Sequence, residues 1–182
     1  MGKLLKIAIT GPESTGKSML AQQLADHYVT VWVPEFARVH LLNINRPYNY
    51  DDLLEIAQKQ KASEKVFEPL ANKLLFADTE LFVTKIWCDV KYKKCHPWIT
   101  EELKNQHYDL YLLMDVDLPW EYDPLREHPD KRSYLMGLYK NELEKYGCNY
   151  KLVSGNGDVR FRHALRHVQE LIDKKVRERH IV

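Results

Sequence analysis

The sequence predicts a three-layer α/β/α fold, in which helices cover both faces of a five-stranded parallel sheet. Two observations support this fold class. Five short runs of apolar and β-branched residues alternate along the chain with segments of helical periodicity. The first run ends in a glycine-containing turn that leads directly into a helical segment. Strands that alternate with helices pair in parallel, because each helix supplies the crossover to the next strand.

The expected elements have boundary signals in the sequence. The second strand is β-branched and aromatic and stops at Pro34, while Asp51 and Asp52 suit the start of a long helix. The expected strands are 4–10, 30–33, 73–77, 110–114 and 150–153. The expected helices are 17–28, about 35–43, 50–69, 79–91, 98–106, about 133–146 and about 158–178.

The bulk composition is that of one soluble domain, which we place at 1–182. The chain has 182 residues, of which 45% are apolar, and this is enough for a packed core. Its net charge of +1 gives no support for binding nucleic acid or a membrane surface. We see no secretory signal and no apolar run of about 20 residues, so we expect a cytoplasmic protein. The three cysteines have no CxxC spacing and are interpreted as reduced thiols. A homo-oligomer is compatible with the sequence.

The turn after the first expected strand reads Gly11-Pro-Glu-Ser-Thr-Gly16-Lys17-Ser18. It matches the phosphate-loop pattern GxxxxGK[ST] in the strand–loop–helix context that the motif requires. Backbone N–H groups of such a loop point at a phosphate, Lys17 reaches the β- and γ-phosphates, and Ser18 offers a hydroxyl to Mg²⁺. The motif therefore predicts a P-loop NTPase fold that binds ATP and Mg²⁺. We expect the nucleotide to contact Gly11, Glu13, Ser14, Thr15, Gly16, Lys17, Ser18 and Met19.

A phosphate loop alone does not separate a kinase from a motor or a switch. Glu35 and Arg38 follow the second strand and lie one helical turn apart, so both can face the cleft at the carboxyl edge of the sheet. The carboxylate could accept a hydroxyl proton or orient a ribose, and the arginine could clamp a phosphate. The alternative is a surface ion pair at the start of a helix.

The third strand is followed by Asp78, Thr79 and Glu80. An aspartate at the end of an apolar strand is typical of a Walker B site, where it holds Mg²⁺ directly or through water. We expect Asp78 to bind the metal or the substrate, and Thr79 to contact the substrate. Alternatively, Asp78 or Thr79 caps the next helix.

A Pro-rich, charged segment follows the fourth strand, and we expect it to form a lid over about 118–146. Small kinases need a mobile segment that brings arginines onto the transferring phosphoryl group and excludes water. Arg126 and Arg132 suit this role, and the alternative is an exposed charged loop. Trp120 could stack on a base of the substrate or pack in the interior.

The turn 154–157 follows the fifth strand, where it would border the adenine of ATP. We expect its backbone to read the edge of the base, with Asn156 in contact with ATP. Arg160 could stack on the base.

Together these segments resemble the ribosylnicotinamide kinase domain of NadR-type proteins. The resemblance runs from about residue 4 to 170 and rests on GPESTGKS, VPEFAR, FADTELFVTKIW and the stretch 108–132. Members of that family phosphorylate the 5′-hydroxyl of nicotinamide riboside with ATP and Mg²⁺. The resemblance places phosphate and Mg²⁺ at Gly16, Lys17 and Ser18, a strand-end acid at Asp78, the nucleoside at Glu35 and Arg38, and the lid at Arg126 and Arg132.

The chain departs from this family pattern in two ways. NadR-type proteins commonly carry an adenylyltransferase domain and sometimes a DNA-binding helix-turn-helix, and we expect neither here. The lid reads Asp123-Pro124-Leu125-Arg126, where the family often has glycine in the second position. Proline at that position stiffens the hinge of the lid.

Our leading interpretation is a nucleoside kinase in which Lys17, Asp78, Glu35, Arg126 and Arg132 carry the chemistry. Asp78 or Glu35, rather than Asp115, takes the proton of the acceptor hydroxyl. One alternative is a kinase for another nucleoside or for a nucleoside monophosphate. A second alternative is a regulatory module in which slow ATP hydrolysis controls a partner interaction. The acids and arginines argue against this module, because a switch needs no acceptor pocket.

Overall fold

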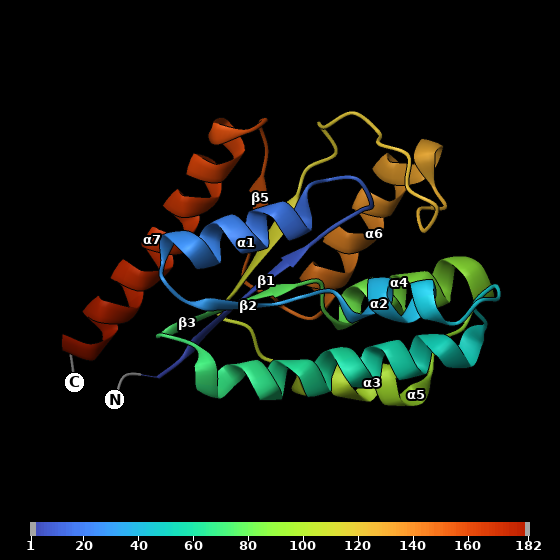
Figure 1. The fold of residues 1–182 in the computed structure, drawn as a ribbon. Helices are drawn as coiled ribbons and strands as arrows, with labels where there is room; N and C mark the ends of the chain where they lie inside the picture. Colours follow the sequence, from blue (N-terminus) through green and yellow to red (C-terminus); the bar gives the residue numbers. More distant parts are fainter. Residues whose placement is uncertain (1–2, 181–182) are drawn as a thin grey trace.

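The computed structural model describes residues 3–180 and has the predicted three-layer architecture (Figure 1). Residues 1–2 and 181–182 of the predicted domain lie outside the described part. The elements occur in the order β1 (Leu5–Thr10), α1 (Lys17–His27), β2 (Val31–Val33), α2 (Phe36–Asn43), α3 (Tyr50–Phe67), η1 (Glu68–Leu70), β3 (Leu74–Asp78), α4 (Leu81–Trp87), η2 (Cys88–Tyr92), α5 (Pro97–Asn105), β4 (Leu110–Met114), η3 (Pro129–Lys131), α6 (Arg132–Lys145), β5 (Tyr150–Val153) and α7 (Asp158–His180).

The five strands form one parallel sheet in the order β2-β3-β1-β4-β5. β1 lies at its centre, where Ile7 pairs with Phe76 of β3 and with Leu110 of β4. Ile7 and Ala8 are consecutive and both are fully buried. Their side chains point to opposite faces of the sheet and belong to different core clusters. A strand that is buried on both faces is typical of a parallel sheet covered by helices, and the predicted fold class is confirmed.

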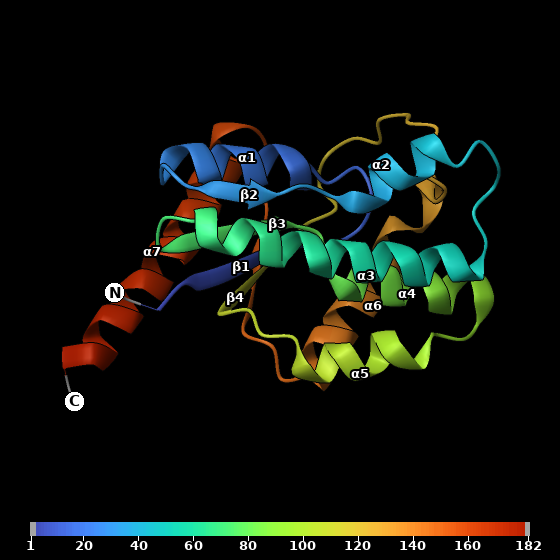
Figure 2. The same ribbon diagram turned by 60° about the horizontal axis from the view of Figure 1, so that its bottom comes forward.

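Two layers of helices enclose this sheet (Figures 1 and 2). On one face, Leu24 of α1 and Val168 of α7 belong to one core cluster. On the other face, Leu53 of α3, Phe82 of α4 and Leu143 of α6 belong to the second cluster. The three cysteines are free, as expected from their spacing. Within the described chain, no helix is both long enough and apolar enough to cross a membrane.

The turn between β3 and α4 corrects one predicted helix boundary. The sequence favours a helix over 79–91, but Thr79 has a φ of 70° and α4 begins only at Leu81. Glu80 is its N-cap, because the Glu80 carboxylate accepts a 2.8 Å hydrogen bond from the backbone N–H of Phe82. Glu80 therefore takes the capping role that the sequence left open for Asp78 or Thr79. A π-helix over Cys88–Tyr92 then continues α4.

The carboxyl ends of β1, β3 and β4 meet at one edge of the sheet, as parallel pairing requires. The phosphate loop leaves β1 at this edge and leads into α1. Apart from the single turn η3, the chain from β4 to α6 is irregular, and it passes over the same edge before it reaches α6 (Figure 1). The fold thus brings together the segments that the sequence predicts for nucleotide, metal and lid.

Candidate active site

A cavity of about 450 Å³ opens at the carboxyl edge of the sheet. The phosphate loop, the start of α2, one side of α4 and α6, the lid and the turn after β5 all contribute to its wall. The predicted site residues that line it are Gly11, Glu13, Ser14, Thr15, Gly16, Lys17, Ser18, Met19, Glu35, Arg38, Arg126 and Asn156. Of the predicted residues, all within the described chain, Asp78, Thr79, Trp120 and Arg132 do not line it.

The phosphate loop has the backbone geometry that its glycines allow. Gly11 has a φ of 132°, and a Cβ there would lie 3.0 Å from the carbonyl oxygen of Met114. The Nζ of Lys17 donates hydrogen bonds to the carbonyls of Gly11 (3.0 Å) and Pro12 (2.8 Å). The ammonium group is therefore held across the loop by neutral acceptors. A phosphate group offers a charged acceptor in place of these carbonyls, and such bonds are stronger.

Asp78 lies just behind the loop and is 1% exposed. Ser18 and Lys17 lie near its carboxylate, whose Oδ1 is buried and has no hydrogen-bond partner among the described residues. Burial raises the pKa of Asp78, and the contacts with Ser18 and Lys17 oppose this rise. A hydroxyl beside an unpartnered carboxylate oxygen is a donor set that suits Mg²⁺, which prefers oxygen ligands.

Thr79 does not line the cavity, and its substrate contact stays a prediction. Its backbone N–H donates a 3.0 Å hydrogen bond to the carbonyl of Ile9, and the residue is 4% exposed. The left-handed backbone at Thr79 turns the chain away from the sheet edge before α4 begins.

Glu35 lines the cavity, as do the carboxylates of Glu13, Glu121 and Asp123. It is the N-cap residue of α2, yet its side chain makes no capping hydrogen bond within the described structure. Burial, followed by the charge of Asp78, raises the pKa of Glu35 to about 7, and the charges of Lys17 and Arg38 oppose the rise. A carboxylate with this pKa is suited to accept a proton near neutral pH.

The lid is closed over the phosphate loop. Arg126 donates hydrogen bonds through Nη1 to the Ser14 hydroxyl (3.3 Å) and to the carbonyl of Glu121 (2.5 Å). Arg38 of α2 pairs with Asp123 of the lid at 2.8 Å. Arg38 thus links α2 to the lid, and both partners of this ion pair line the cavity.

Arg132 and Trp120 do not line the cavity, and their contacts with phosphate and substrate stay predictions. Nη1 of Arg132 donates hydrogen bonds to the carbonyls of Ser14 (3.2 Å) and Leu118 (2.9 Å). Its guanidinium lies 5.7 Å from the ring centre of Trp120. In this closed arrangement both side chains stabilise the lid, and neither faces the cavity.

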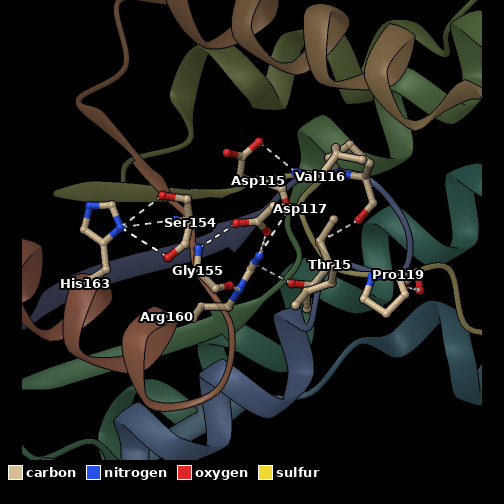
Figure 3. Close-up of polar contacts among 12 residues, drawn as sticks. Thr15, Asp115, Val116, Asp117, Pro119, Ser154, Gly155, Arg160 and His163 are labelled. Atoms are coloured by element: carbon tan, nitrogen blue, oxygen red, sulfur yellow. Dashed lines mark hydrogen bonds and ion pairs between the residues drawn. The ribbon is translucent and has the colours of Figure 1, made fainter.

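The turn after β5 borders the opposite end of the cavity, where Asn156 and Gly157 form part of the wall. Arg160 follows in the first turn of α7 but is only 5% exposed. Its guanidinium pairs with Asp117 and with backbone carbonyls (Figure 3). Arg160 also lines the cavity, so its stacking on a base stays a prediction.

The apolar wall of the cavity could not be identified from the sequence. Val83, Ile86 and Trp87 of α4 line the cavity together with Leu135 and Tyr139 of α6. The i, i+3, i+4 spacing in α4 was visible, but the same spacing marks any helix that packs on a core. Only the position of both helices beside the phosphate loop distinguishes a cavity wall from a closed core.

Comparison with known proteins identifies similar chains. A family model described as an AAA domain matches residues 6–162. The chain is 31% identical over 177 residues to the trifunctional NAD biosynthesis/regulator protein NadR of Salmonella typhimurium, and 27% identical over 176 residues to that of Escherichia coli. Each match covers 93% of this chain and 43% of the relative, so the chain spans less than half the length of these curated relatives.

One solved structure supports the same relationship at the level of the fold. The crystal structure of a NadR protein in complex with NR superposes with a TM-score of 0.81 at 21% identity, over 92% of this chain and 50% of that one. The resemblance to NadR-type kinase domains that the sequence motifs indicate is thereby confirmed.

Proposed function

We propose that this chain, which belongs to the AAA domain family, is an ATP-dependent kinase that converts nicotinamide riboside to nicotinamide mononucleotide. The proposal rests on the position of one acid beside the phosphate loop. Glu35, with a pKa raised to about 7, lies at the cavity wall near Lys17 of the phosphate loop. The donor phosphates and a proton acceptor for a hydroxyl group thus share one cavity.

The shape and chemistry of the cavity suit a nucleoside acceptor. The apolar wall with Trp87 and Tyr139 offers aromatic surface to a flat ring, while Glu35 and Arg38 offer polar groups to a ribose. The named role of the relatives in NAD biosynthesis, and the NR bound to the similar structure, favour nicotinamide riboside among nucleosides. We place the reaction in the cytoplasm, with small molecules alone as partners.

In the proposed reaction, the phosphate loop and Lys17 bind the β- and γ-phosphates of ATP. Glu35 accepts the proton of the 5′-hydroxyl, whose oxygen forms a bond to the γ-phosphorus as the bond to the β–γ bridging oxygen breaks. Arg126 at the cavity wall is placed to stabilise the charge on the phosphoryl group. The closed lid excludes water that would otherwise compete with the hydroxyl.

Ser18 and Asp78 are the residues that would hold Mg²⁺, because they combine a hydroxyl with a buried carboxylate oxygen that has no described partner. The ion would neutralise charge on the β- and γ-phosphate oxygens. Asp78 lies behind Ser18 and does not line the cavity, so we assign the role of base to Glu35.

A panel of acceptors tests this function. ADP release is measured with nicotinamide riboside, thymidine, adenosine and pyrimidine monophosphates. We expect the highest kcat/KM with nicotinamide riboside. Lys17→Ala should abolish turnover, whereas Lys151→Ala, at an exposed position of β5, should not change it. Stronger turnover with thymidine or a monophosphate would replace the proposed substrate, and ATP consumption that no acceptor stimulates would favour a regulatory module.

A further inference from the structure

We infer that Arg160 is a positioning residue for the nucleotide donor, which it serves by holding the phosphate loop and the turn after β5 in a fixed relation. The inference rests on the proposed function only in that the phosphate loop binds a nucleotide. It assigns a role to a buried cation that the proposed reaction does not use.

The guanidinium of Arg160 joins three separate segments of the chain (Figure 3). Nη1 donates a 2.9 Å hydrogen bond to the carbonyl of Thr15 in the phosphate loop. Nε donates a 2.7 Å hydrogen bond to the carbonyl of Gly155 in the turn after β5. Nη2 pairs with Asp117, which follows β4. All three segments leave the sheet at the edge where the cavity opens.

The bond to Thr15 fixes the direction of one peptide group in the phosphate loop. In a planar trans peptide the carbonyl of Thr15 and the N–H of Gly16 point in opposite directions. Because Arg160 holds the carbonyl, the N–H of Gly16 is held in the opposite direction, and an N–H group that is fixed in this way can donate to a bound phosphate. Thr15 is 1% exposed, so water cannot readily replace this donor.

The ion pair of Arg160 and Asp117 binds both backbone polar groups of Gly155. Its N–H donates a 2.6 Å hydrogen bond to Oδ2 of Asp117, and its carbonyl accepts the bond from Arg160. Gly155 has a φ of 99°, and a Cβ there would lie 2.7 Å from Cγ1 of Val159. The two residues that follow, Asn156 and Gly157, belong to the cavity wall. The ion pair therefore sets the separation between the phosphate end and the base end of the nucleotide site.

The contacts of Arg160 suit the shape of an arginine side chain. Nε and the two Nη atoms bind three acceptors that lie in different directions. The fixed fork of a guanidinium can reach all three at once, whereas a lysine ammonium is a single point on a flexible chain. Replacement by lysine keeps the charge beside Asp117 but leaves carbonyls in this region without a donor.

Equilibrium binding of Mg·ADP tests the inference without an acceptor, for example by calorimetry. Arg160→Met should raise the Kd for Mg·ADP at least tenfold, and Arg160→Lys should give an intermediate rise. Arg162→Met, at an exposed position two residues further along α7, should bind as the wild type does. In the kinase assay, Arg160→Met should raise the KM for ATP while the KM for the nucleoside stays within twofold.

The outcomes separate this inference from the proposed function. If the wild type bound no Mg·ADP, the proposed function would fail. If Arg160→Met kept the circular dichroism of the wild type and bound Mg·ADP equally well, the positioning role would be overturned. If Arg160→Met does not fold, Asp117→Asn tests the positioning role in its place. This variant removes the charge that pairs with Arg160 and keeps an oxygen that can accept the hydrogen bond from the N–H of Gly155. A Kd for that variant at least fivefold above wild type supports the role, and a smaller change overturns it.

Discussion

The carboxylate of Glu13, in the phosphate loop, accepts a 3.1 Å hydrogen bond from the backbone N–H of His128 in the lid. The adjacent N–H of Glu127 donates a second bond of 3.1 Å to the same oxygen. The loop that binds the donor phosphates thus also holds the lid, through an acid that the motif itself does not specify. The contact makes lid closure depend on the conformation of the phosphate loop.

Removing this contact should loosen the lid. We expect Glu13→Ala to lower kcat/KM about tenfold, since hydrogen bonds to a charged group contribute about 1.5–3 kcal/mol each and partial exposure reduces that value. Glu13→Gln keeps an acceptor oxygen and should lose less. The measurement is the ratio of ATP hydrolysed to nucleoside phosphorylated, which should increase for Glu13→Ala because water enters the site. An unchanged ratio in a folded variant would show that Glu13 does not control closure.

Glu35→Gln tests the assignment of the base. General base catalysis contributes about a hundredfold to ten-thousandfold, so kcat should fall by at least about a hundredfold while the KM for ATP changes little. Because the pKa of Glu35 is raised to about 7, its carboxyl group is ionised above that pH and can then act as the base. In the wild type, kcat/KM should therefore fall as the pH drops below about 7, and the variant should lose this limb. A variant that retained the wild-type pH profile would move the base to another group.

Asp78→Asn tests the metal site. The amide keeps the size of the side chain but removes the charge that faces Ser18, so it binds Mg²⁺ more weakly. We expect the Mg²⁺ concentration for half-maximal activity to rise about tenfold or more, as is typical when a group that orients or ligates a metal is lost. Asp26→Asn, at an exposed position of α1, is the matched control. Equal Mg²⁺ dependence in the two variants would contradict the site.

Trp87→Ala tests the apolar wall as the nucleoside site. Stacking of a base on an aromatic side chain contributes about 1–3 kcal/mol, so the KM for the nucleoside should rise about tenfold. The KM for ATP should stay near the wild-type value, because Trp87 belongs to α4 and not to the phosphate loop. Trp98→Ala, in α5 and away from the cavity wall, provides a comparison. Equal effects on both KM values would indicate general destabilisation and not a binding role.

Much of the fold was predictable because its signals are local. Apolar runs of strand length, and a phosphate-loop motif between a strand and a helix, determine five parallel strands and the edge where a nucleotide binds. Glu35 and Asp78 could be placed there for the same reason, since each lies at or just after the carboxyl end of a strand. The start of α4 was misplaced because the left-handed backbone of Thr79, a β-branched residue, has no signal in the sequence.

The remaining site residues depend on contacts that are distant in sequence. Arg132 has the same charge as Arg126, but only the path of the lid turns Arg132 towards the carbonyls of Ser14 and Leu118. Arg160 reaches Thr15 across 145 positions, so its neighbourhood gave no indication of a link to the phosphate loop. Side-chain type predicted the chemistry of these groups, and tertiary packing decided which of them face the cavity.

The most direct measurement of the proposed function follows the fate of the phosphoryl group. The protein is incubated with ATP labelled in the γ-phosphate, Mg²⁺ and nicotinamide riboside, and the products are separated by chromatography. We predict that the label appears in the 5′-phosphate of nicotinamide mononucleotide, in equal amount to the ADP formed, and that Lys17→Ala produces neither. Label found only in inorganic phosphate, at a rate that nicotinamide riboside does not change, would contradict the account.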